Sequence, residues 1–534
     1  MPKNNETSFD KCFNLPNPGL RSYFDIVRKG QPDEYRTTFA KGSSVQSVLD
    51  DWRSTLESIT DKWPTLVDFE NDLRSKVGPM SVMKPLEERL EDIDHYYDDI
   101  KLESTPISVT AIKAVVAEFN AVRGLRIRDQ MRTVDLMKKS TNSGSPYFTK
   151  RKVVTKKTIP CLMKVTDDQV LQYLDTRDMT VSPWNACAVL GWRGQEGGPN
   201  KEDVKQRVVW MFPYAVNIAE LQVYQPLIEG CQRFSLVPAW VSMESVDLRV
   251  TRMFDTKGVD DVVICTDFSK FDQHFNADMQ LCASTILSAI LSPGRKEKDW
   301  LEEVFPIKYM IPLAYDYGKI RSGRHGMGSG SGGTNADETI AHRALQYEAA
   351  ISNHQRLNPN SQCLGDDGVL TYPGITVEDV MRSYTAHGLE MNDSKQYVSK
   401  QDCVYLRRWH HKDYRIGGVC VGVYSTYRAL GRLMEQERYY DPDVWSATMV
   451  ALRQLSIIEN VKYHPLREQF ADFCMKRDKY RLGIDIPGFL DNVSSIAKES
   501  MDLMPDFLGY TKSMVQDQTG LDSWWIVNYL KSKR

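Results

Sequence analysis

Short apolar runs next to acidic residues mark the two segments that are most clearly predicted to be strands. Residues 262–265 read Val-Val-Ile-Cys, and Asp267 follows two positions later. A run of this length and composition predicts a buried strand. Apolar residues also flank Gly-Asp-Asp-Gly at 365–368, and this pattern predicts a tight antiparallel hairpin. Each segment would therefore present carboxylates where a strand or a hairpin ends.

A glycine-rich loop between these segments leads into a predicted helix. Six of the eleven residues from Gly323 to Gly333 are glycine, and a helical pattern follows, with Thr334 as the expected N-cap. Asp337 and Glu338 fall in its first turn. Glycine-rich loops that enter helices often bind phosphate. Because acids in the first turn repel phosphate, we expect them to accept hydrogen bonds from a sugar hydroxyl instead.

Two common phosphate-binding loops are excluded at this position. The loop has no Gly-Lys-Ser/Thr, which excludes a Walker loop. It does contain Gly-x-Gly-x-x-Gly, but no apolar strand precedes it, which excludes a Rossmann dinucleotide site. The three glycines of that pattern are Gly328, Gly330 and Gly333.

The two ends of the chain have helical patterns without a chemical motif. Between Lys84 and Glu103, eight acidic and three basic side chains alternate with apolar ones, which indicates a solvated helix face. Past Tyr424 the chain is predicted to be mostly helical. Three arginines there recur at helical spacing and either follow an RNA backbone or form a solvated face: Arg428, Arg432 and Arg438. The last aromatic residues are expected to dock onto the body: Trp524, Trp525 and Tyr529.

Composition places the chain among ordinary globular proteins, with 41% hydrophobic and 26% charged residues. Its 534 residues suggest several domains or one large multi-lobed enzyme. The ten scattered cysteines form no CxxC pair, so we expect buried free thiols in a reducing compartment. The first residues lack the apolar core of a signal peptide. The longest apolar stretch, 281–291, is far shorter than the ~20 residues of a membrane span.

The net charge of −3 excludes binding to nucleic acid through a uniformly basic surface. Basic residues instead gather locally. From Lys138 to Lys157 there are seven Lys or Arg and no acid, and the turn sequence TNSGSPY, 141–147, lies inside this stretch. Its hydroxyls are suited to donate to phosphates. Two further basic segments lie around Lys205 and around Arg407.

The acidic residues suggest a site for divalent cations. Asp267, at the end of a buried strand, is solvated on one side only and is suited to bind a hard cation. In a helix, Asp272 would lie about 140° around the axis from it, so the two acids are expected to have different roles. Asp366 and Asp367 repel each other and need cations for neutralisation. A lone Gly-Asp-Asp is weak support, because about one chain in ten of this length contains one by chance.

In order along the chain, these elements resemble seven motifs of viral RNA-dependent RNA polymerases, which makes chance agreement negligible. Residues 141–147 resemble the motif that admits the template, and Lys205-x-Arg207 resembles a fingertip motif that contacts triphosphate. Four further segments resemble the first to the fourth palm motif, in this order: Asp267-x4-Asp272, Ser329-Gly330-x3-Thr334, Gly365-Asp366-Asp367, and GLEMNDSK ending at Lys395. The segment Tyr405-Leu406-Arg407-Arg408 resembles the primer-grip hairpin that follows the palm motifs. The chain length and the residues of these motifs most resemble those of the polymerases of picobirnaviruses, a family of bisegmented double-stranded RNA viruses.

The resemblance implies an α+β fold shaped like a right hand. Its palm would be an antiparallel sheet backed by helices, its thumb mostly helical, and an N-terminal extension would bridge fingers and thumb. The implied boundaries are 1–105 for the extension, 106–255 for the fingers, 256–275 and 321–410 for the palm, 276–320 for a fingers insertion, and 411–534 for the thumb and C-terminal segment.

The resemblance also implies transfer of nucleotides from NTPs to an RNA 3′-hydroxyl with two Mg²⁺ ions, or Mn²⁺ in their place. Asp267 and Asp366 would bind both metals with help from Asp367. Lys205 and Arg207 would neutralise the triphosphate. Lys395 would protonate the leaving pyrophosphate, and a plain exposed lysine is the alternative.

Ribose and RNA contacts follow from the same resemblance. Reverse transcriptases carry an aromatic residue where Asp272 stands, so an acid there favours recognition of the ribose 2′-hydroxyl, with Ser329, Thr334 and Glu338 nearby. Asn335 and Asp337 remain alternatives to Glu338, which the register favours. The implied RNA-binding residues are Thr141, Ser143, Gly144, Pro146, Lys150, Arg151, Arg407 and Arg408.

The implied partners are template and product RNA, NTPs and a viral capsid protein, without a membrane. The implied catalytic unit is a monomer in the virion interior and the host cytoplasm. Three alternatives stay open. They are a reverse-transcriptase-like DNA polymerase, against which Asp272 argues, a non-catalytic RNA-binding protein with a relic palm, and a metal-dependent nuclease, which would not need the glycine-rich loop or Lys205-x-Arg207.

Overall fold

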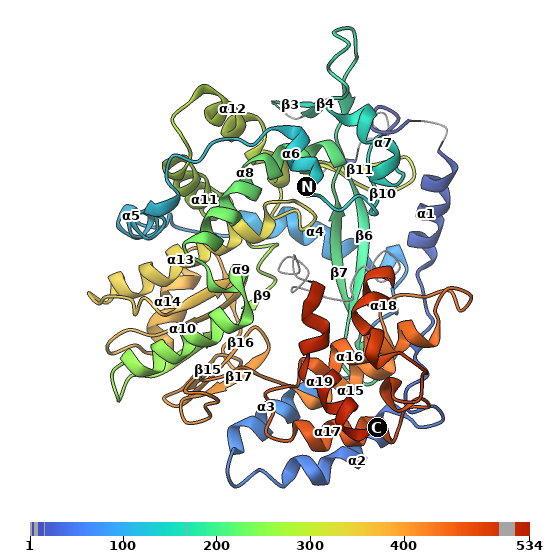
Figure 1. Ribbon diagram of the computed structural model, residues 1–534. Helices are drawn as coiled ribbons and strands as arrows, with labels where there is room; N and C mark the ends of the chain where they lie inside the picture. Colours follow the sequence, from blue (N-terminus) through green and yellow to red (C-terminus); the bar gives the residue numbers. More distant parts are fainter. Residues whose placement is uncertain (1–2, 5–8, 15–16, 168, 501–517) are drawn as a thin grey trace.

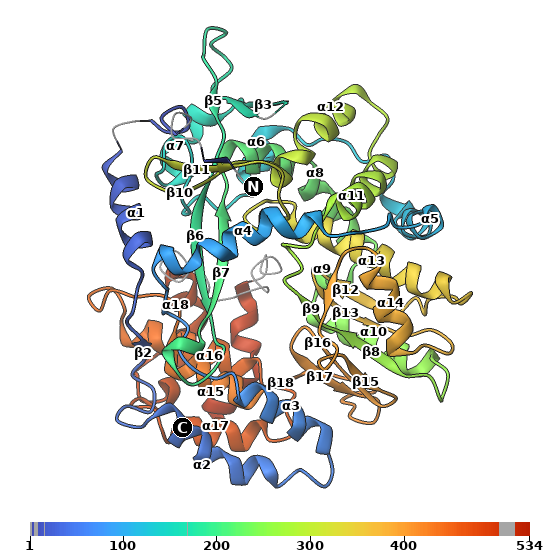
Figure 2. The same cartoon turned by 180° about the vertical axis from the view of Figure 1, so that it is seen from behind.

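The computed structural model describes residues 3–4, 9–14, 17–167, 169–500 and 518–534. Helices and β-sheets alternate along the chain, which confirms the predicted α+β class. Figures 1 and 2 show the elements arranged around a central region. The hairpin of β6 and β7 runs along one side of it, and the C-terminal helices lie at the lower end of that hairpin. A smaller sheet backed by helices lies opposite.

The smaller sheet has the strand order β12-β13-β8-β15, and all its pairs are antiparallel. Its strands are β8 (Val263–Thr266), β12 (Gln362–Leu364), β13 (Asp367–Leu370) and β15 (Tyr397–Ser399). Val263 and Cys265 pack with α10 (Met243–Thr256), whereas Ile264 belongs to the main core with α11 (Ala277–Ile290) and α13 (Thr334–Ser352). Because β8 is covered on both faces, the position where it ends is fixed by the core.

One hairpin and one long-range strand pair flank this sheet. The first joins β16 (Asp402–Tyr405) to β17 (Arg408–His411), and β18 (Val423–Tyr424) completes its three-stranded sheet. Leu406 and Arg407 form its two-residue turn with φ of 53° and 58°, the conformation of a type I′ turn. The second pairing joins β9 (Phe268–Ser269) to β14 (Glu390–Met391), which follows α14 (Val377–Thr385).

The larger, five-stranded sheet has the order β1-β11-β10-β6-β7. Its strands are β1 (Lys3–Asn4), β6 (Ala188–Gln195), β7 (Lys205–Met211), β10 (Leu313–Asp316) and β11 (Lys319–Ser322). Leu20 and Phe24 of α1 (Pro18–Lys29) pack against Val189 and Ala314 of this sheet. A separate sheet contains β3 (Leu162–Thr166), β4 (Gln169–Tyr173) and β5 (Trp184–Asn185).

Helices fill the space between the sheets. The main hydrophobic core contains residues of α4 (Leu90–Asp98), α5 (Val109–Glu118), α6 (Gln130–Asp135), α7 (Arg151–Thr158), α8 (Tyr214–Arg233) and α12 (Arg295–Glu303). Short helix α9 (Pro238–Val241) contacts α8 and α10. Ile93, Tyr96 and Tyr97 of α4 are buried, so the acidic stretch predicted as a solvated face has one face in the core.

The C-terminal helices share a core with the N-terminal part of the chain. They are α15 (Thr426–Met434), α16 (Ala447–Glu459), α17 (Arg467–Met475), α18 (Val493–Ser500) and α19 (Trp525–Lys533). Residues of α2 (Val45–Glu57) lie in the same core, α3 (Pro64–Arg74) packs on α15, and β2 (Tyr35–Arg36) pairs with β19 (Glu435–Gln436). Glu459 accepts hydrogen bonds from the backbone of Trp525 and Ile526 at 3.1 and 2.9 Å, which confirms the predicted docking.

Two further predictions are resolved by the fold. All ten cysteines lie among the described residues, and they are buried thiols outside any disulfide, as expected. Arg428, however, does not form a solvated or RNA-facing surface. It is buried in an ion pair with Glu196, just after β6, and its Nε donates to the Tyr424 hydroxyl at 3.1 Å. Among the described residues, no helix is long and apolar enough to cross a membrane.

Candidate active site

Strand pairing brings the two acidic segments to one edge of the small sheet. Thr266 of β8 lies opposite Gly368 of β13, so Asp267, which follows β8, emerges beside the turn that precedes β13. The charge of Asp267 contributes to the raised pKa of Asp366, which places the two carboxylates within electrostatic range. The predicted strand and the predicted Gly-Asp-Asp-Gly hairpin are both confirmed.

Asp267 is held by two amide side chains that the sequence did not single out. Asn392 Nδ2 donates to Asp267 Oδ2 at 3.1 Å. Gln396 accepts from the backbone N–H of Asp267 at 3.0 Å and donates to its carbonyl at 2.8 Å. Asn392 lies within the motif that ends at Lys395, and Gln396 follows it directly, which is the one sequence signal that marks them. The loop after β14 therefore fixes the orientation of this carboxylate.

The two adjacent aspartates have different surroundings. Asp366 is exposed at the turn, yet surrounding protein raises its pKa, and the charges of Asp272 and Asp267 raise it further, whereas Arg207 lowers it. Burial, followed by the charge of Asp366, raises the pKa of Asp367 to about 7. One oxygen of Asp367 accepts from the Leu406 N–H at 2.7 Å. Asp367 thus ties the β16–β17 turn to the sheet.

The candidates for ribose recognition include Asp272 and three residues in the first turns of α13, which are Asn335, Asp337 and Glu338. Asp337 is fully buried and accepts from the hydroxyls of Tyr224 and Tyr309, both at 2.7 Å. It also pairs with buried Lys308 at 3.0 Å, so it has no oxygen left for a ligand. Glu338 is buried beside Asp272, and burial, then that charge, raises its pKa well above the usual range. Of the three candidates at 335, 337 and 338, Glu338 is the acid that faces Asp272.

The glycine-rich loop is folded against β7 and α8. A Cβ on Gly330 would lie 1.5 Å from the carbonyl oxygen of Trp210, so this close approach requires glycine. The predicted N-cap is wrong: Gly333 occupies that position, and Thr334 begins the helix. The Thr334 hydroxyl donates to the Gly328 carbonyl at 3.0 Å, and the Ser329 hydroxyl donates to Val208 at 3.2 Å. In this conformation both hydroxyls therefore stabilise the loop.

Basic residues from three elements face the acids. Lys205 and Arg207 are exposed on β7. Partial burial lowers the pKa of each, and Arg407 lowers both further, as Lys395 does for Lys205. The charges of Asp366 and Asp272 act on Arg207 in the opposite direction. Arg408, in contrast, points away from this group and stacks 5.6 Å from the centre of the Tyr424 ring.

The TNSGSPY loop contains exposed and buried members. Thr141 and Lys150 are exposed, whereas Ser143, Gly144 and Pro146 are buried. The Ser143 hydroxyl accepts from the Thr149 N–H at 3.1 Å. The buried residues shape the loop, and the contact of the Ser143 hydroxyl with a phosphate stays a prediction. Arg151 is half-buried and donates to the Lys138 carbonyl at 3.2 Å.

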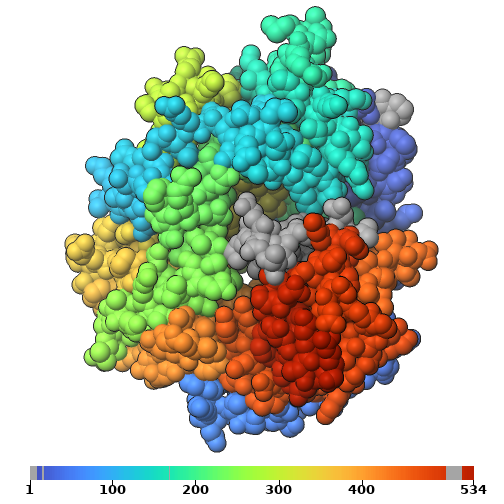
Figure 3. All heavy atoms as spheres, viewed as in Figure 1, coloured from blue at the N-terminus to red at the C-terminus, as the bar shows by residue number. Residues whose placement is uncertain are grey.

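The carboxylate oxygens at the edge of the small sheet are chemically suited to bind hard divalent cations. Carboxylate oxygens are the ligands that Mg²⁺ and Mn²⁺ prefer, and burial, followed by the charge of a neighbouring carboxylate, raises the pKa values of Asp366 and Asp367. Within the part of the chain that the structure describes, no three His, Cys, Asp or Glu side chains already form a compact metal cluster. Figure 3 shows a hollow near the centre of one face, between the green helices α8–α10 and the red C-terminal helices.

Comparison with known proteins adds independent findings. The family model described as viral RNA-dependent RNA polymerase matches residues 79–419. A curated protein of Human picobirnavirus (strain Human/Thailand/Hy005102/-), named "Potential RNA-dependent RNA polymerase", is 64% identical over 533 residues, which cover 98% of this chain and 99% of that protein. The crystal structure of the RNA-dependent RNA polymerase of a human picobirnavirus superposes with a TM-score of 0.94 at 63% identity, and its insertion-loop deletion mutant with 0.93 at 62%. Each structural match covers 99% of both chains.

Proposed function

The chain belongs to the viral RNA-dependent RNA polymerases, and we propose that it replicates and transcribes a double-stranded RNA genome by metal-dependent nucleotide transfer. Template RNA and NTPs are the substrates of any enzyme of this kind. One observation carries the mechanism: the register of β8 and β13 brings Asp267 and Asp366 to one edge of one sheet. This edge faces a cluster of cations on other elements.

Asp267 and Asp366 would hold the two metal ions, Mg²⁺ or Mn²⁺, with help from Asp367. When bound, these ions neutralise charge on the attacking and leaving oxygens. Asn392 fixes the direction of the Asp267 carboxylate through its hydrogen bond. Asp367 contributes mainly by anchoring the turn, because it shares its charge with the Leu406 N–H.

Cations opposite the acids would bind the triphosphate. Arg207 is suited to bidentate contact with phosphate oxygens, and Lys205 supplies a second charge. Lys395 lies close enough to Lys205 to affect its pKa. From there it would donate a proton to the leaving pyrophosphate.

Selection of ribonucleotides would rest on Asp272 and Glu338. Burial, followed by the charge of Asp272, raises the pKa of Glu338 well above the usual range, which favours the protonated carboxyl group, and that form would be the donor. Asp272 accepts. This pair of donor and acceptor matches a 2′-hydroxyl, which both donates and accepts. Ser329 and Thr334 would support it by holding the loop.

RNA contacts would come from basic residues in two places, around the TNSGSPY loop and at the β16–β17 turn. Thr141, Lys150 and half-buried Arg151 would contact the template, and Arg407 at the hairpin turn would contact the primer strand. Arg408 would act by packing behind that turn.

We assign residues 1–105 to an extension, 106–255 to fingers with an insertion at 276–320, 256–275 and 321–410 to a palm, and 411–534 to a thumb. We also propose a monomeric catalytic unit that contacts capsid protein inside the virion and works in the host cytoplasm.

The test is a product gel with purified protein, an unprimed RNA template and either four rNTPs or four dNTPs. RNA products from the wild type and none from Asp366→Ala, with unchanged template binding, would support the proposal. Products from dNTPs at a similar rate would favour DNA synthesis. Template binding without any product would favour a non-catalytic RNA-binding protein, and template cleavage would favour a nuclease.

A further inference from the structure

One face of α13 contacts the backbone of the hairpin that carries Asp366. Four residues of that face follow helical spacing, at i, i+3, i+4 and i+7. Their side chains are buried, and each bonds to main-chain atoms between residues 359 and 369. They are Thr339, His342, Arg343 and Gln346.

The first two of these residues hold Gly365, immediately before Asp366. The Gly365 N–H donates to the Thr339 hydroxyl at 2.9 Å. The Gly365 carbonyl lies 2.8 Å from His342 Nδ1. Because burial lowers the pKa of His342 to about 4, the ring is neutral. Since a carbonyl only accepts, Nδ1 carries the hydrogen. Both polar groups of Gly365 are therefore fixed by one helix.

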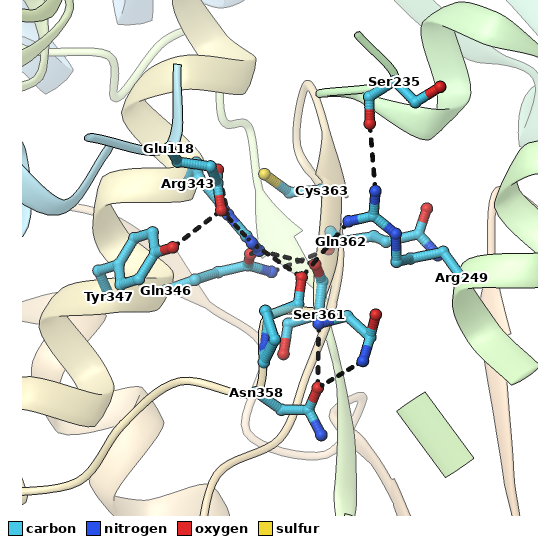
Figure 4. Close-up of polar contacts among 12 residues, drawn as sticks. Glu118, Ser235, Arg249, Arg343, Gln346, Tyr347, Asn358, Ser361, Gln362 and Cys363 are labelled. Atoms are coloured by element: carbon cyan, nitrogen blue, oxygen red, sulfur yellow. Dashed lines mark hydrogen bonds and ion pairs between the residues drawn. The ribbon is translucent and has the colours of Figure 1, made fainter. Parts of the chain in front are cut away.

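The other two residues hold the base of the hairpin (Figure 4). Arg343 donates to the Ser361 carbonyl at 2.7 Å and is itself paired with Glu118, at the end of α5, at 2.7 Å. Gln346 donates to the Gln362 carbonyl at 2.8 Å. The base is thus tied to α13 and α5, which restricts movement of the hairpin to its tip.

The tip is where movement matters for catalysis. Gly365 adopts φ of +57°, and Asp366 is repelled by the charges of Asp272 and Asp267. Without a restraint, this repulsion would turn the exposed carboxylate away from its neighbours. Active-site groups need placement within about 0.5 Å, which a glycine turn alone does not provide.

We propose that Thr339 and His342 are positioning residues for Asp366, holding the Gly365 peptide groups so that this carboxylate keeps its place among the other acids. This inference rests on the proposed role of Asp366 as a metal ligand. Neither residue contacts the reacting groups. They act through the backbone, in the way that outer residues orient metal ligands in other enzymes.

A matched pair of threonines separates positioning from stability. Thr339→Val removes the bond at the tip. Thr371→Val removes a similar buried bond at the far end of the same hairpin, where the Thr371 hydroxyl donates to the Val262 carbonyl at 2.8 Å. His342→Leu removes the second contact at the tip, and His342→Gln restores a donor. Asp366→Ala is measured in parallel.

Three quantities are measured: the melting temperature, kcat and KM for one nucleotide on a primed RNA, and Mn²⁺ binding by the electron paramagnetic resonance of the free ion. We expect both threonine variants to melt at similar temperatures. Only Thr339→Val and His342→Leu should bind Mn²⁺ more weakly and lose kcat, each by about tenfold or more, with KM for the nucleotide changed less than about twofold. His342→Gln should recover part of both losses.

Equal Mn²⁺ affinity and equal kcat for Thr339→Val and Thr371→Val would overturn the inference, as would loss in all variants in proportion to melting temperature. Full activity and Mn²⁺ binding in Asp366→Ala would instead overturn the proposed role of Asp366. The two failures are therefore distinguishable.

Discussion

At the scale of single residues, the site consists of acidic side chains whose like charges repel one another. Asp366 and Glu338 both have raised pKa values, from burial first and from Asp272 next. Arg207 lowers the pKa of Asp366 in return. Charge that is only partly neutralised by protein side chains is what a site for cationic ligands requires.

Asp272→Ala should reduce the preference for rNTPs over dNTPs. A hydrogen bond that involves a charged group contributes about 1.5–3 kcal/mol, so the ratio of kcat/KM for rNTP to that for dNTP should fall by at least about tenfold. Single-nucleotide kinetics with matched rNTP and dNTP give this ratio. If it stays at the wild-type value while both rates fall together, Asp272 does not read the 2′-hydroxyl.

Residue-level expectations were accurate where a local pattern determines the outcome. Gly365 in the left-handed region and the pairing of Cys363 with Gly368 follow from the Gly-Asp-Asp-Gly pattern. The contacts of Asn392 with Asp267 and of Asp367 with Leu406 could not be predicted. They join residues 125 and 39 positions apart, and no local periodicity encodes such a pairing.

At the scale of elements, the glycine-rich loop depends on a buried acid in α8. Glu220 accepts from the Gly332 N–H at 3.1 Å and from the Ser331 hydroxyl. Burial raises its pKa from 4.5 to about 7, against the charge of Lys308. The loop is therefore tied to a carboxyl group that titrates near neutrality.

Glu220→Gln should change how stability depends on pH. The folded wild type holds a proton on Glu220 that the unfolded chain releases, so this group costs stability as pH rises from about 4.5 to about 7, on the order of 3 kcal/mol in total. The variant lacks that titration. Its melting temperature should rise relative to wild type between pH 5 and pH 8. Parallel melting curves across this range would contradict the assignment.

Element boundaries show why the prediction of the cap failed. Thr334 is a good N-cap by residue type, but its hydroxyl is needed by the Gly328 carbonyl. A loop with six glycines in eleven residues has few side chains of its own, so its backbone groups take partners from neighbouring elements. The helix itself was predicted correctly, because its pattern extends over 19 residues.

At the scale of the whole molecule, the β6–β7 hairpin joins the five-stranded sheet to the C-terminal part of the chain. Its end contacts the C-terminal helices through the buried pair of Glu196 with Arg428 and through Arg193 with Glu437 at 3.0 Å. From α3, Glu70 accepts from the backbone N–H of Thr426 at 3.0 Å at the start of α15. We call these contacts the closure of the hairpin and α3 onto the C-terminal part of the chain, and they explain why Arg428 is buried although its spacing suggested exposure.

Glu196→Gln should shorten RNA products while leaving the first addition intact. Loss of the charge leaves Arg428 buried and unpaired, which costs about 3–5 kcal/mol locally and loosens the closure. The number of nucleotides added per binding event, measured with a heparin trap, should fall several-fold. Asp485→Asn, in the exposed Arg481 pair at 2.8 Å, is the matched control. An equal loss in the single-nucleotide rate would show that Glu196 acts on the site and not on closure.

If Asp267 and Asp366 act as one metal-binding centre, as proposed, their substitutions should be strongly coupled in a double-mutant comparison. Asp267→Glu, Asp366→Glu and the double variant are compared with wild type in rapid-quench incorporation of one nucleotide. Each single variant should be slower by about 100-fold, and the double variant by no more than about tenfold beyond the worse single variant, because residues of one unit are not additive. A double variant slower by about 10⁴-fold, the product of two independent losses, would contradict the account.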